Sequence, residues 1–134
     1  FVAHVGDSRL YRIRDGQIQQ VTRDHSLIQQ LLDAGTFQTT AQAEAAGIRN
    51  NVLTRGLGIE DKVEIDVADE PLEPGDLFLL CSDGLTNMVT DHDIKQIINH
   101  YKQDLDAAAE RLMLGALSAG GHDNITLVLA RPEL

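Results

Sequence analysis

Three aspartates occupy similar positions in the sequence: each lies at one end of an apolar, strand-like run, beside a residue that favours a sharp turn. Asp7 and Asp83 each follow such a run, and Asp123 precedes one over residues 125–129. If these strand ends meet, three carboxylates share a small volume, and like charges that close need a cation among them. Oxygen ligands of this kind suit a hard divalent ion, Mg²⁺ or Mn²⁺. The pattern therefore predicts a metal site formed by the three aspartates.

Other interpretations of the same residues stay open. An aspartate beside a glycine also makes a turn without any metal, and that interpretation fits each of the three taken alone. A non-catalytic calcium-binding domain fits less well, because no loop of alternating acidic ligands closed by a glutamate is present. None of the histidines has zinc-ligand spacing with Cys81 or with another histidine. Cys81 lies inside an apolar run and is expected only to pack in the core.

The composition is that of a folded, acidic chain. Its 134 residues are 43% hydrophobic, and 11 basic against 21 acidic residues give a net charge of −10. Such a charge argues against binding to nucleic acid or to an anionic membrane, because both need a basic patch. The sequence has neither a membrane-spanning apolar stretch nor a signal-peptide pattern. A single cysteine excludes an intrachain disulfide, and we expect a cytoplasmic location.

Periodicity predicts the elements that must position the aspartates. Strands are expected over 9–14, 17–22, 63–67, 77–81 and 124–130. The first two form a hairpin around Asp15-Gly16, the third is wet on one face, and the fourth is buried on both. Helices are expected from a cap at Ser26 to Gly35, over 40–46, from a cap at Thr90, and over 105–117. Strand pairs followed by helices indicate an α+β domain.

Five short motifs follow one another along the chain. They are Val5-Gly6-Asp7-Ser8-Arg9, Thr22-Arg23-Asp24-His25-Ser26, Leu53-Thr54-Arg55-Gly56-Leu57-Gly58, Ser82-Asp83-Gly84-Leu85 and Asp123-Asn124-Ile125-Thr126. The series resembles the metal-dependent serine/threonine protein phosphatases of the 2C type, specifically the bacterial branch. The likeness covers nearly the whole chain, and the stretch 26–51 resembles the family's variable flap subdomain.

The resemblance implies an α+β fold that is part of a four-layer α-β-β-α sandwich with two antiparallel sheets. Asp83 and Asp123 match metal-binding aspartates of the family, and Asp7 matches one that helps to hold a third, weaker metal in bacterial members. The implied cofactors are two Mg²⁺ or Mn²⁺ ions and a third, weaker one. Because a metal-activated water attacks the phosphate, no residue of the chain is assigned as catalytic. Asn87 stands where many relatives have an aspartate, so we expect the third site to bind loosely.

Parts of the family's active site are absent from the sequence: a phosphate-binding arginine, a metal-binding Glu-Asp pair and a bridging Asp-Gly loop. The resemblance therefore implies that residues 1–134 are the C-terminal portion of one catalytic domain, with its N-terminal portion absent. We expect the parent protein to hydrolyse phosphoserine and phosphothreonine in substrates of a serine/threonine kinase, and the fragment alone to be inactive. A non-catalytic phosphatase-like binding or regulatory module is the alternative. Unpaired sheet edges also predict self-association of the fragment.

For each of two further residues, the sequence is compatible with two roles. His25 follows Asp24 and could form an acid–base pair with it, but we interpret it as a hydrogen-bonded anchor where the hairpin meets the following helix. Arg55 lies in a glycine-flanked loop and could bind phosphate. We expect it to make a structural ion pair instead.

Overall fold

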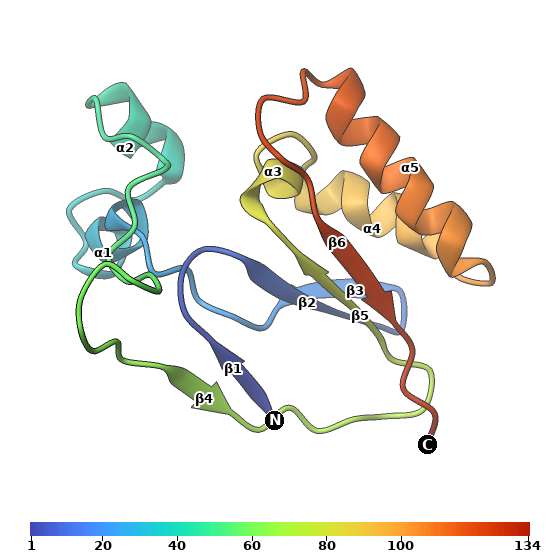
Figure 1. Cartoon of the computed structure of the whole chain (residues 1–134). Coiled ribbons are helices and arrows are strands. Elements are labelled where there is room, and N and C mark those ends of the chain that lie inside the picture. The colour runs from blue at the N-terminus through green and yellow to red at the C-terminus, as the bar shows by residue number, and fades with distance from the viewer. The chain divides into compact units, whose positions relative to one another are not determined.

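The computed structural model describes residues 1–134, and these form two compact units. The first unit contains residues 1–7 and 23–70, and the second contains residues 8–22 and 71–134. Each unit has an antiparallel sheet of its own (Figure 1). The structure thus confirms the predicted mixture of helices with two antiparallel sheets.

The first unit has a two-stranded sheet and two short helices. Its elements are β1 (Val2–His4), α1 (Leu27–Asp33), α2 (Thr40–Ala45) and β4 (Asp66–Ala68). Strands β1 and β4 pair so that His4 lies opposite Asp66. The Ser26 side chain caps α1 by accepting a hydrogen bond from the backbone N–H of Gln29 at 3.2 Å. Gly35 follows the helix with φ +73°, a conformation that favours glycine, so both predicted helix ends are confirmed.

Strand β4 differs from the strand predicted over 63–67. The alternation there predicted that Ile65 and Val67 face a core, but their side chains are 55% and 65% exposed. Only residues 66–68 pair with β1, and the side chain that makes contacts inside the unit is the carboxylate of Asp66. The face of this strand that makes polar contacts within the unit is therefore the one that carries Asp66.

The second unit is built on a four-stranded sheet with the order β3-β2-β5-β6. Its elements are β2 (Arg9–Arg14), β3 (Gln17–Gln20), β5 (Leu77–Cys81), α3 (Asp83–Thr86), α4 (Asp91–His100), α5 (Leu105–Ser118) and β6 (Leu127–Ala130). Asp15 and Gly16 join β2 to β3 with φ of 50° and 75°. Positive φ at both central residues belongs to the two-residue turn that matches strand twist, so the predicted hairpin is confirmed.

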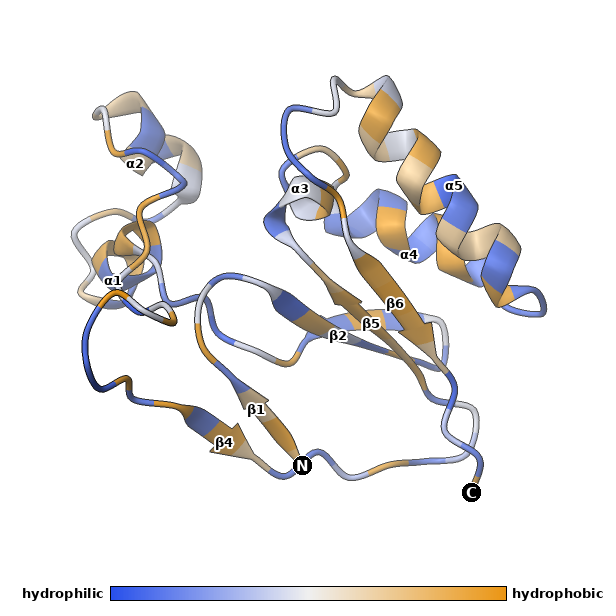
Figure 2. Cartoon of the chain, in the orientation of Figure 1, coloured by the Kyte–Doolittle hydropathy of each residue, from blue (hydrophilic) through white to orange (hydrophobic).

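One face of this sheet forms the main core with α4 and α5. Alternate side chains of the strands pack against buried side chains of the helices; the sheet gives Tyr11, Ile13, Leu77, Leu79 and Cys81, and the helices give Ile94, Ile98, Leu112 and Ala116. Figure 2 shows β5 and β6 as largely hydrophobic strands next to helices of mixed character. The predicted buried face of the last helix, spaced by four residues along α5, is confirmed.

The opposite face of the sheet is apolar over β5 and β6 but polar over β3 and much of β2, where Arg12 pairs with Gln19, and it is less covered. Leu80 and Val128 lie opposite each other on β5 and β6, and their side chains are 46% and 54% exposed. The prediction that residues 77–81 are buried on both faces is therefore wrong at Leu80. A paired apolar patch on a sheet face is unusual for a surface exposed only to water.

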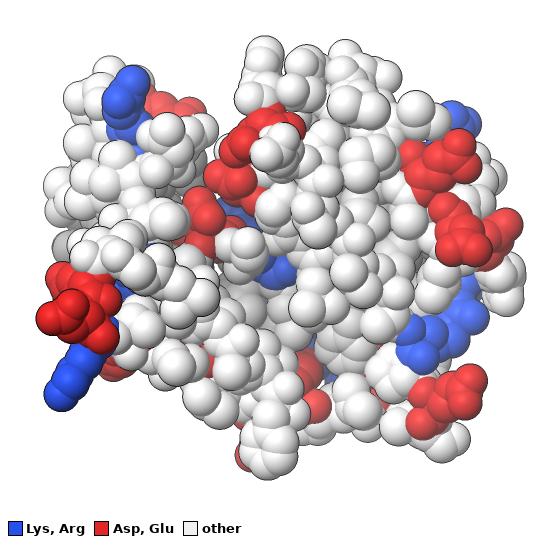
Figure 3. Space-filling model, in the orientation of Figure 1, with Lys and Arg blue, Asp and Glu red and all other residues white.

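Polar contacts fix the ends of the second unit. Arg14 donates two hydrogen bonds to the buried carboxylate of Asp76, each at 2.8 Å, and this pairing lowers the pKa of Asp76. The buried Tyr11 hydroxyl donates to Asp91 at 2.9 Å, which ties β2 to the start of α4. No helix in the structure combines the length and the apolar character that crossing a membrane requires. Acidic side chains are spread over the face shown in Figure 3, which carries no broad basic patch.

Candidate metal centre

Asp83 starts a short helix directly after the central strand β5. Strand β5 ends at Cys81, Ser82 adopts the extended conformation of an N-cap, and Asp83 is the first residue of α3. The sequence predicted a turn here and missed this helix. Asn87 ends α3, and its backbone N–H donates to the carbonyl oxygen of Asp83 at 2.9 Å. Residues four apart on a helix lie on the same face, so Asn87 stands beside the predicted metal ligand.

The segment that contains Asp123 is bound directly to the segment that contains Asp83. Ser82 donates its backbone N–H to the carbonyl oxygen of Thr126 at 3.0 Å, and its Oγ accepts from the N–H of Thr126 at 3.1 Å. The same Oγ lies 3.3 Å from the carbonyl oxygen of Asn124. These bonds replace sheet pairing over 124–126, which is why β6 begins at Leu127 and not at the predicted Asn124.

Gly84 shows how closely the two segments approach. A Cβ atom added at this position would lie 2.1 Å from the carbonyl oxygen of Asn124 and 2.9 Å from its carbonyl carbon. Its backbone dihedral is not one that requires glycine, so the requirement is one of space. The Asp-Gly and Asp-Asn motifs therefore meet at one end of the sheet, with each aspartate next to a contacting residue. The structure brings these two predicted ligands onto adjoining segments (Figure 1).

Asp7 belongs to the first unit, whereas Asp83 and Asp123 belong to the second. It follows Gly6, which is buried and has φ +104°, and its own side chain is partly buried. The prediction that all three aspartates share one metal centre stays a prediction.

His25, predicted as a hydrogen-bonded anchor where the hairpin meets the following helix, makes hydrogen bonds to residues of the first unit. Its backbone N–H donates to the carbonyl oxygen of Gly6 at 2.9 Å, and its Nδ1 accepts from the N–H of Gly6 at 3.1 Å. Its Nε2 lies 2.8 Å from a carboxylate oxygen of Asp66. Arg55 donates to the other oxygen of Asp66 at 2.8 Å, which confirms the expected structural ion pair. The partner of both residues, Asp66, was missed because its separation of 41 residues from His25 leaves no local pattern.

His4, His25 and Asp66 form the one group of three or more side chains whose ligand atoms lie close enough, within 4.8 Å, to hold a metal ion. The hydrogen bonds oppose that use. Because Nδ1 of His25 accepts from Gly6, the ring proton must sit on Nε2, where it faces Asp66. A metal on Nε2 would move that proton to Nδ1, opposite the N–H of Gly6, and place two donors against each other. His4 Nε2 likewise lies 2.9 Å from the carbonyl oxygen of Arg23, an acceptor.

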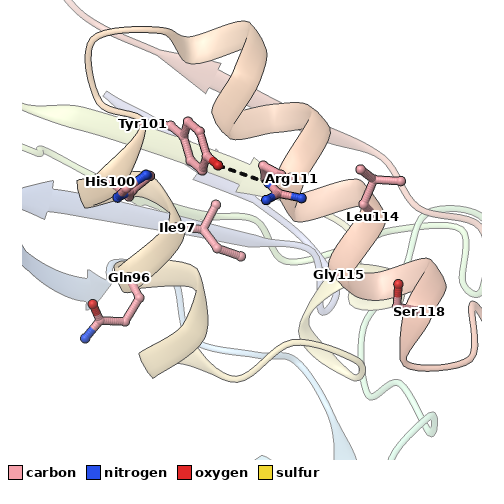
Figure 4. Close-up of a pocket in the computed structure, with 8 residues that line it drawn as sticks. All are labelled: Gln96, Ile97, His100, Tyr101, Arg111, Leu114, Gly115 and Ser118. Carbon is pink, nitrogen blue, oxygen red and sulfur yellow. Dashed lines mark hydrogen bonds between the residues drawn. The ribbon is translucent and has the colours of Figure 1, made fainter.

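A groove of the second unit lies between α4 and α5 and contains none of the three aspartates. Its volume is about 510 Å³, and it is lined by Gln96, Ile97, His100, Tyr101, Arg111, Leu114, Gly115 and Ser118. Figure 4 shows Arg111 donating to the Tyr101 hydroxyl across this groove, at 3.1 Å. The guanidinium also lies 5.8 Å from the centre of the Tyr101 ring. We regard the contact as a tie between the two helices.

Known phosphatases share both the sequence and the fold. The serine/threonine phosphatase stp of Listeria monocytogenes is 41% identical over 99% of this chain, which covers 52% of its own length. The solved structure of the Streptococcus agalactiae serine/threonine phosphatase superposes with a TM-score of 0.85 at 39% identity, over 95% of this chain and 51% of that one. Residues 11–133 match the family described as stage II sporulation protein E (SpoIIE). The chain belongs to the bacterial 2C-type serine/threonine phosphatase family.

The resemblance found in the five motifs is thereby confirmed. A further member of the family, the catalytic domain of the phosphatase PstP, was solved in complex with two manganese ions, and it superposes with a TM-score of 0.70 at 36% identity, over 95% of this chain and 50% of that one. The chain spans about half the length of the curated relatives that it matches. The contact between Gly84 and Asn124 explains why the Asp-Gly motif of this chain has a glycine beside the Asp-Asn motif.

The close contact at Gly84 predicts a strong effect of one methyl group. Gly84→Ala should push the 123–126 segment away and lower the free energy of unfolding by about 2 kcal/mol, as for other overpacked sites. Gly115→Ala is the matched control, because its Cβ would meet Val89 at an ordinary 3.6 Å in the middle of α5. That variant should be neutral or about 0.5–1 kcal/mol more stable. Urea unfolding of both variants measures the difference, and equal stability would contradict the close contact.

The ion pair of Asp66 predicts a pH dependence. Hydrogen bonds from His25 and Arg55 lower the pKa of Asp66 from 3.8 to about 2. Because the folded pKa is the lower one, the stabilisation is complete above the unfolded value of 3.8 and is lost as the pH falls toward 2. Asp66→Asn should therefore lower the urea midpoint at neutral pH, and the difference from the unaltered chain should narrow below about pH 4. Asp69→Asn, at an exposed site after β4, should show no such pH-dependent difference.

Proposed function

We propose that the protein that carries this chain hydrolyses phosphoserine and phosphothreonine in proteins, and that residues 1–134 supply the C-terminal portion of its catalytic domain. In this proposal Asp83, Asp123 and Asp7 are metal ligands, and the residues 26–51 form the flap. The observation that carries it is the contact of the Asp-Gly segment with the Asp-Asn segment at Gly84 and Asn124. Family membership supports the same assignment.

The donor set fits Mg²⁺ or Mn²⁺. Asp83 and Asp123 offer carboxylate oxygens on adjoining segments that hydrogen bonds from Ser82 hold in place, and hard divalent ions prefer oxygen ligands. A pair of such ions would supply an activated water and would screen the negative charge of the phosphate. The role proposed for the residues of this chain is to bind these ions and to hold them in position. Cys81 is buried in the core and takes no part, in agreement with its predicted packing role.

The proposed position within a larger domain accounts for the apolar sheet face. Leu80 and Val128 are about half exposed on the face of the four-stranded sheet that lies opposite α4 and α5. We propose that this face is an inner face of the four-layer sandwich and is covered in the complete domain. Burial of apolar area of this kind is the main favourable term in such packing. The isolated chain should consequently tend to self-associate.

We expect the isolated chain to lack activity although it carries proposed metal ligands. We expect no turnover of a phosphothreonine peptide with Mn²⁺ by residues 1–134 alone, and turnover by the longer parent protein. Asp83→Asn and Asp123→Asn should each abolish turnover by the parent protein and weaken Mn²⁺ binding by about tenfold or more. Asp61→Asn removes the same charge from an exposed loop and should change neither. Robust turnover by the isolated chain, or unchanged activity in the Asp83 and Asp123 variants, would contradict the proposal; binding of phosphoprotein without turnover by the parent protein would favour the non-catalytic alternative.

The third, weaker metal site should depend on Asn87. A neutral amide at this position adds no charge beside Asp83, so Asn87→Asp should increase the affinity of the weakest Mn²⁺ site by about tenfold. Gln103→Glu adds one negative charge at an exposed loop position and serves as the control. Calorimetric titration of the parent protein with Mn²⁺ gives the measurement. Equal affinity in both variants would rule out Asn87 as a determinant of the site.

A further inference from the structure

Gly6 is held on both of its polar backbone groups by one residue. The carbonyl oxygen of Gly6 accepts from the backbone N–H of His25 at 2.9 Å, and the N–H of Gly6 donates to Nδ1 of the His25 ring at 3.1 Å. Gly6 is buried and has φ +104°. A Cβ at Gly6 would have no atom nearer than 4.0 Å, so the backbone conformation, not lack of space, calls for glycine here.

The ring of His25 is fixed in the tautomer that this contact needs. Its Nε2 lies 2.8 Å from Asp66, so the ring proton belongs on Nε2 and the lone pair on Nδ1 faces Gly6. Asp66 is in turn held by Arg55 at 2.8 Å. The ring of His4 stacks on the same imidazole, with 4.5 Å between ring centres and 16° between planes. The imidazole is only 6% exposed, whereas the Asp66 carboxylate is partly open to solvent.

The backbone of His25 is tied to a third strand-like segment. Its carbonyl oxygen accepts from the N–H of Thr54 at 2.9 Å, and the next residue, Ser26, forms an isolated bridge with Leu53. This segment leads directly to Arg55. The motif around Asp24 is thus bonded both to the backbone immediately before Asp7 and to the segment that leads to Arg55.

We propose that His25 is a positioning residue for Asp7: with Arg55 and Asp66 it fixes the Gly6 backbone from which the Asp7 carboxylate projects. The orientation of an imidazole by a carboxylate is the arrangement that commonly supports metal-binding histidines. Here the other ring nitrogen holds a backbone N–H instead of a metal. The effect of His25 on metal binding therefore passes through Gly6. This inference rests on the proposed function, because it takes Asp7 as a metal ligand.

Two substitutions of His25 each keep one of the two hydrogen bonds that its ring makes. His25→Asn places an amide oxygen near the position of Nδ1, so it can still accept from Gly6 but loses Asp66. His25→Gln reaches the position of Nε2 and can still donate to Asp66, but it loses the acceptor beside Gly6. Both variants remove one imidazole and one hydrogen bond. A role confined to packing or to the Asp66 ion pair predicts equal effects or a milder effect of His25→Gln.

The test compares the two variants with the unaltered chain by NMR. We expect hydrogen exchange of the Gly6 amide to be about tenfold faster in His25→Gln than in His25→Asn. On titration with Mg²⁺, which is diamagnetic, the amide signal of Asp7 should shift in the unaltered chain and in His25→Asn but not in His25→Gln. The signals of Asp83 and Asp123, in the second unit, should shift in all three chains.

The outcomes distinguish the two proposals. Equal Gly6 exchange in the two variants, or an equal Mg²⁺-induced shift at Asp7, overturns the positioning role. Absence of a shift at Asp83 and Asp123 in the unaltered chain counts against the proposed function, while Gly6 exchange still decides the role of His25. If both variants unfold the first unit, the scalar coupling across the hydrogen bond between the Gly6 nitrogen and Nδ1 of His25 is measured in the unaltered chain. Its absence also overturns the proposal.

Discussion

The candidate site depends on how closely two backbone segments approach each other at one end of the four-stranded sheet. Gly84 packs so tightly against the carbonyl group of Asn124 that no side chain fits between them, and the hydroxyl of Ser82 joins the same two segments by hydrogen bonds. Strands β5 and β6 are neighbours, so the residue that leaves one strand and the residue that enters the other are close by necessity. Gly84 and Ser82 then set the separation of the two segments. That separation determines how far apart the backbones of Asp83 and Asp123 lie.

In the first unit, a hydrogen-bonded network and not close packing holds the backbone beside a predicted ligand. Its short sheet and helices bury little apolar surface, and Asp7 follows a glycine whose conformation most residues avoid. A linear network of Arg55, Asp66 and His25 holds that glycine through hydrogen bonds of 2.8 to 3.1 Å. One predicted ligand pair therefore relies on close packing, and the other predicted ligand relies on a polar network in which only the His25 ring is buried. Polar networks fix geometry well when every member has a partner, as these members do.

Much of the fold could be predicted from local patterns. The Asp15-Gly16 turn, the Ser26 cap and the four-residue spacing of Ala108, Leu112 and Ala116 each encode their own element, and the structure has all of them. What the sequence did not predict depends on distant partners. Asp66 looked like a residue on a wet strand face, because its partners lie 41 and 11 residues away. The start of β6 was misplaced because Ser82, far back in the chain, binds Thr126. Leu80 sits in an unbroken apolar run, which cannot tell a buried face from an exposed one.

A cation held between the segments that carry Asp83 and Asp123 is the central feature of the proposed site. Crystals of the chain grown with Mn²⁺ and measured at the manganese absorption edge would locate the ion by anomalous scattering. We expect the strongest anomalous peak within ligand distance of carboxylate oxygens of both Asp83 and Asp123. A strongest peak at His4, His25 and Asp66, with none beside these two aspartates, would contradict a metal site at Asp83 and Asp123.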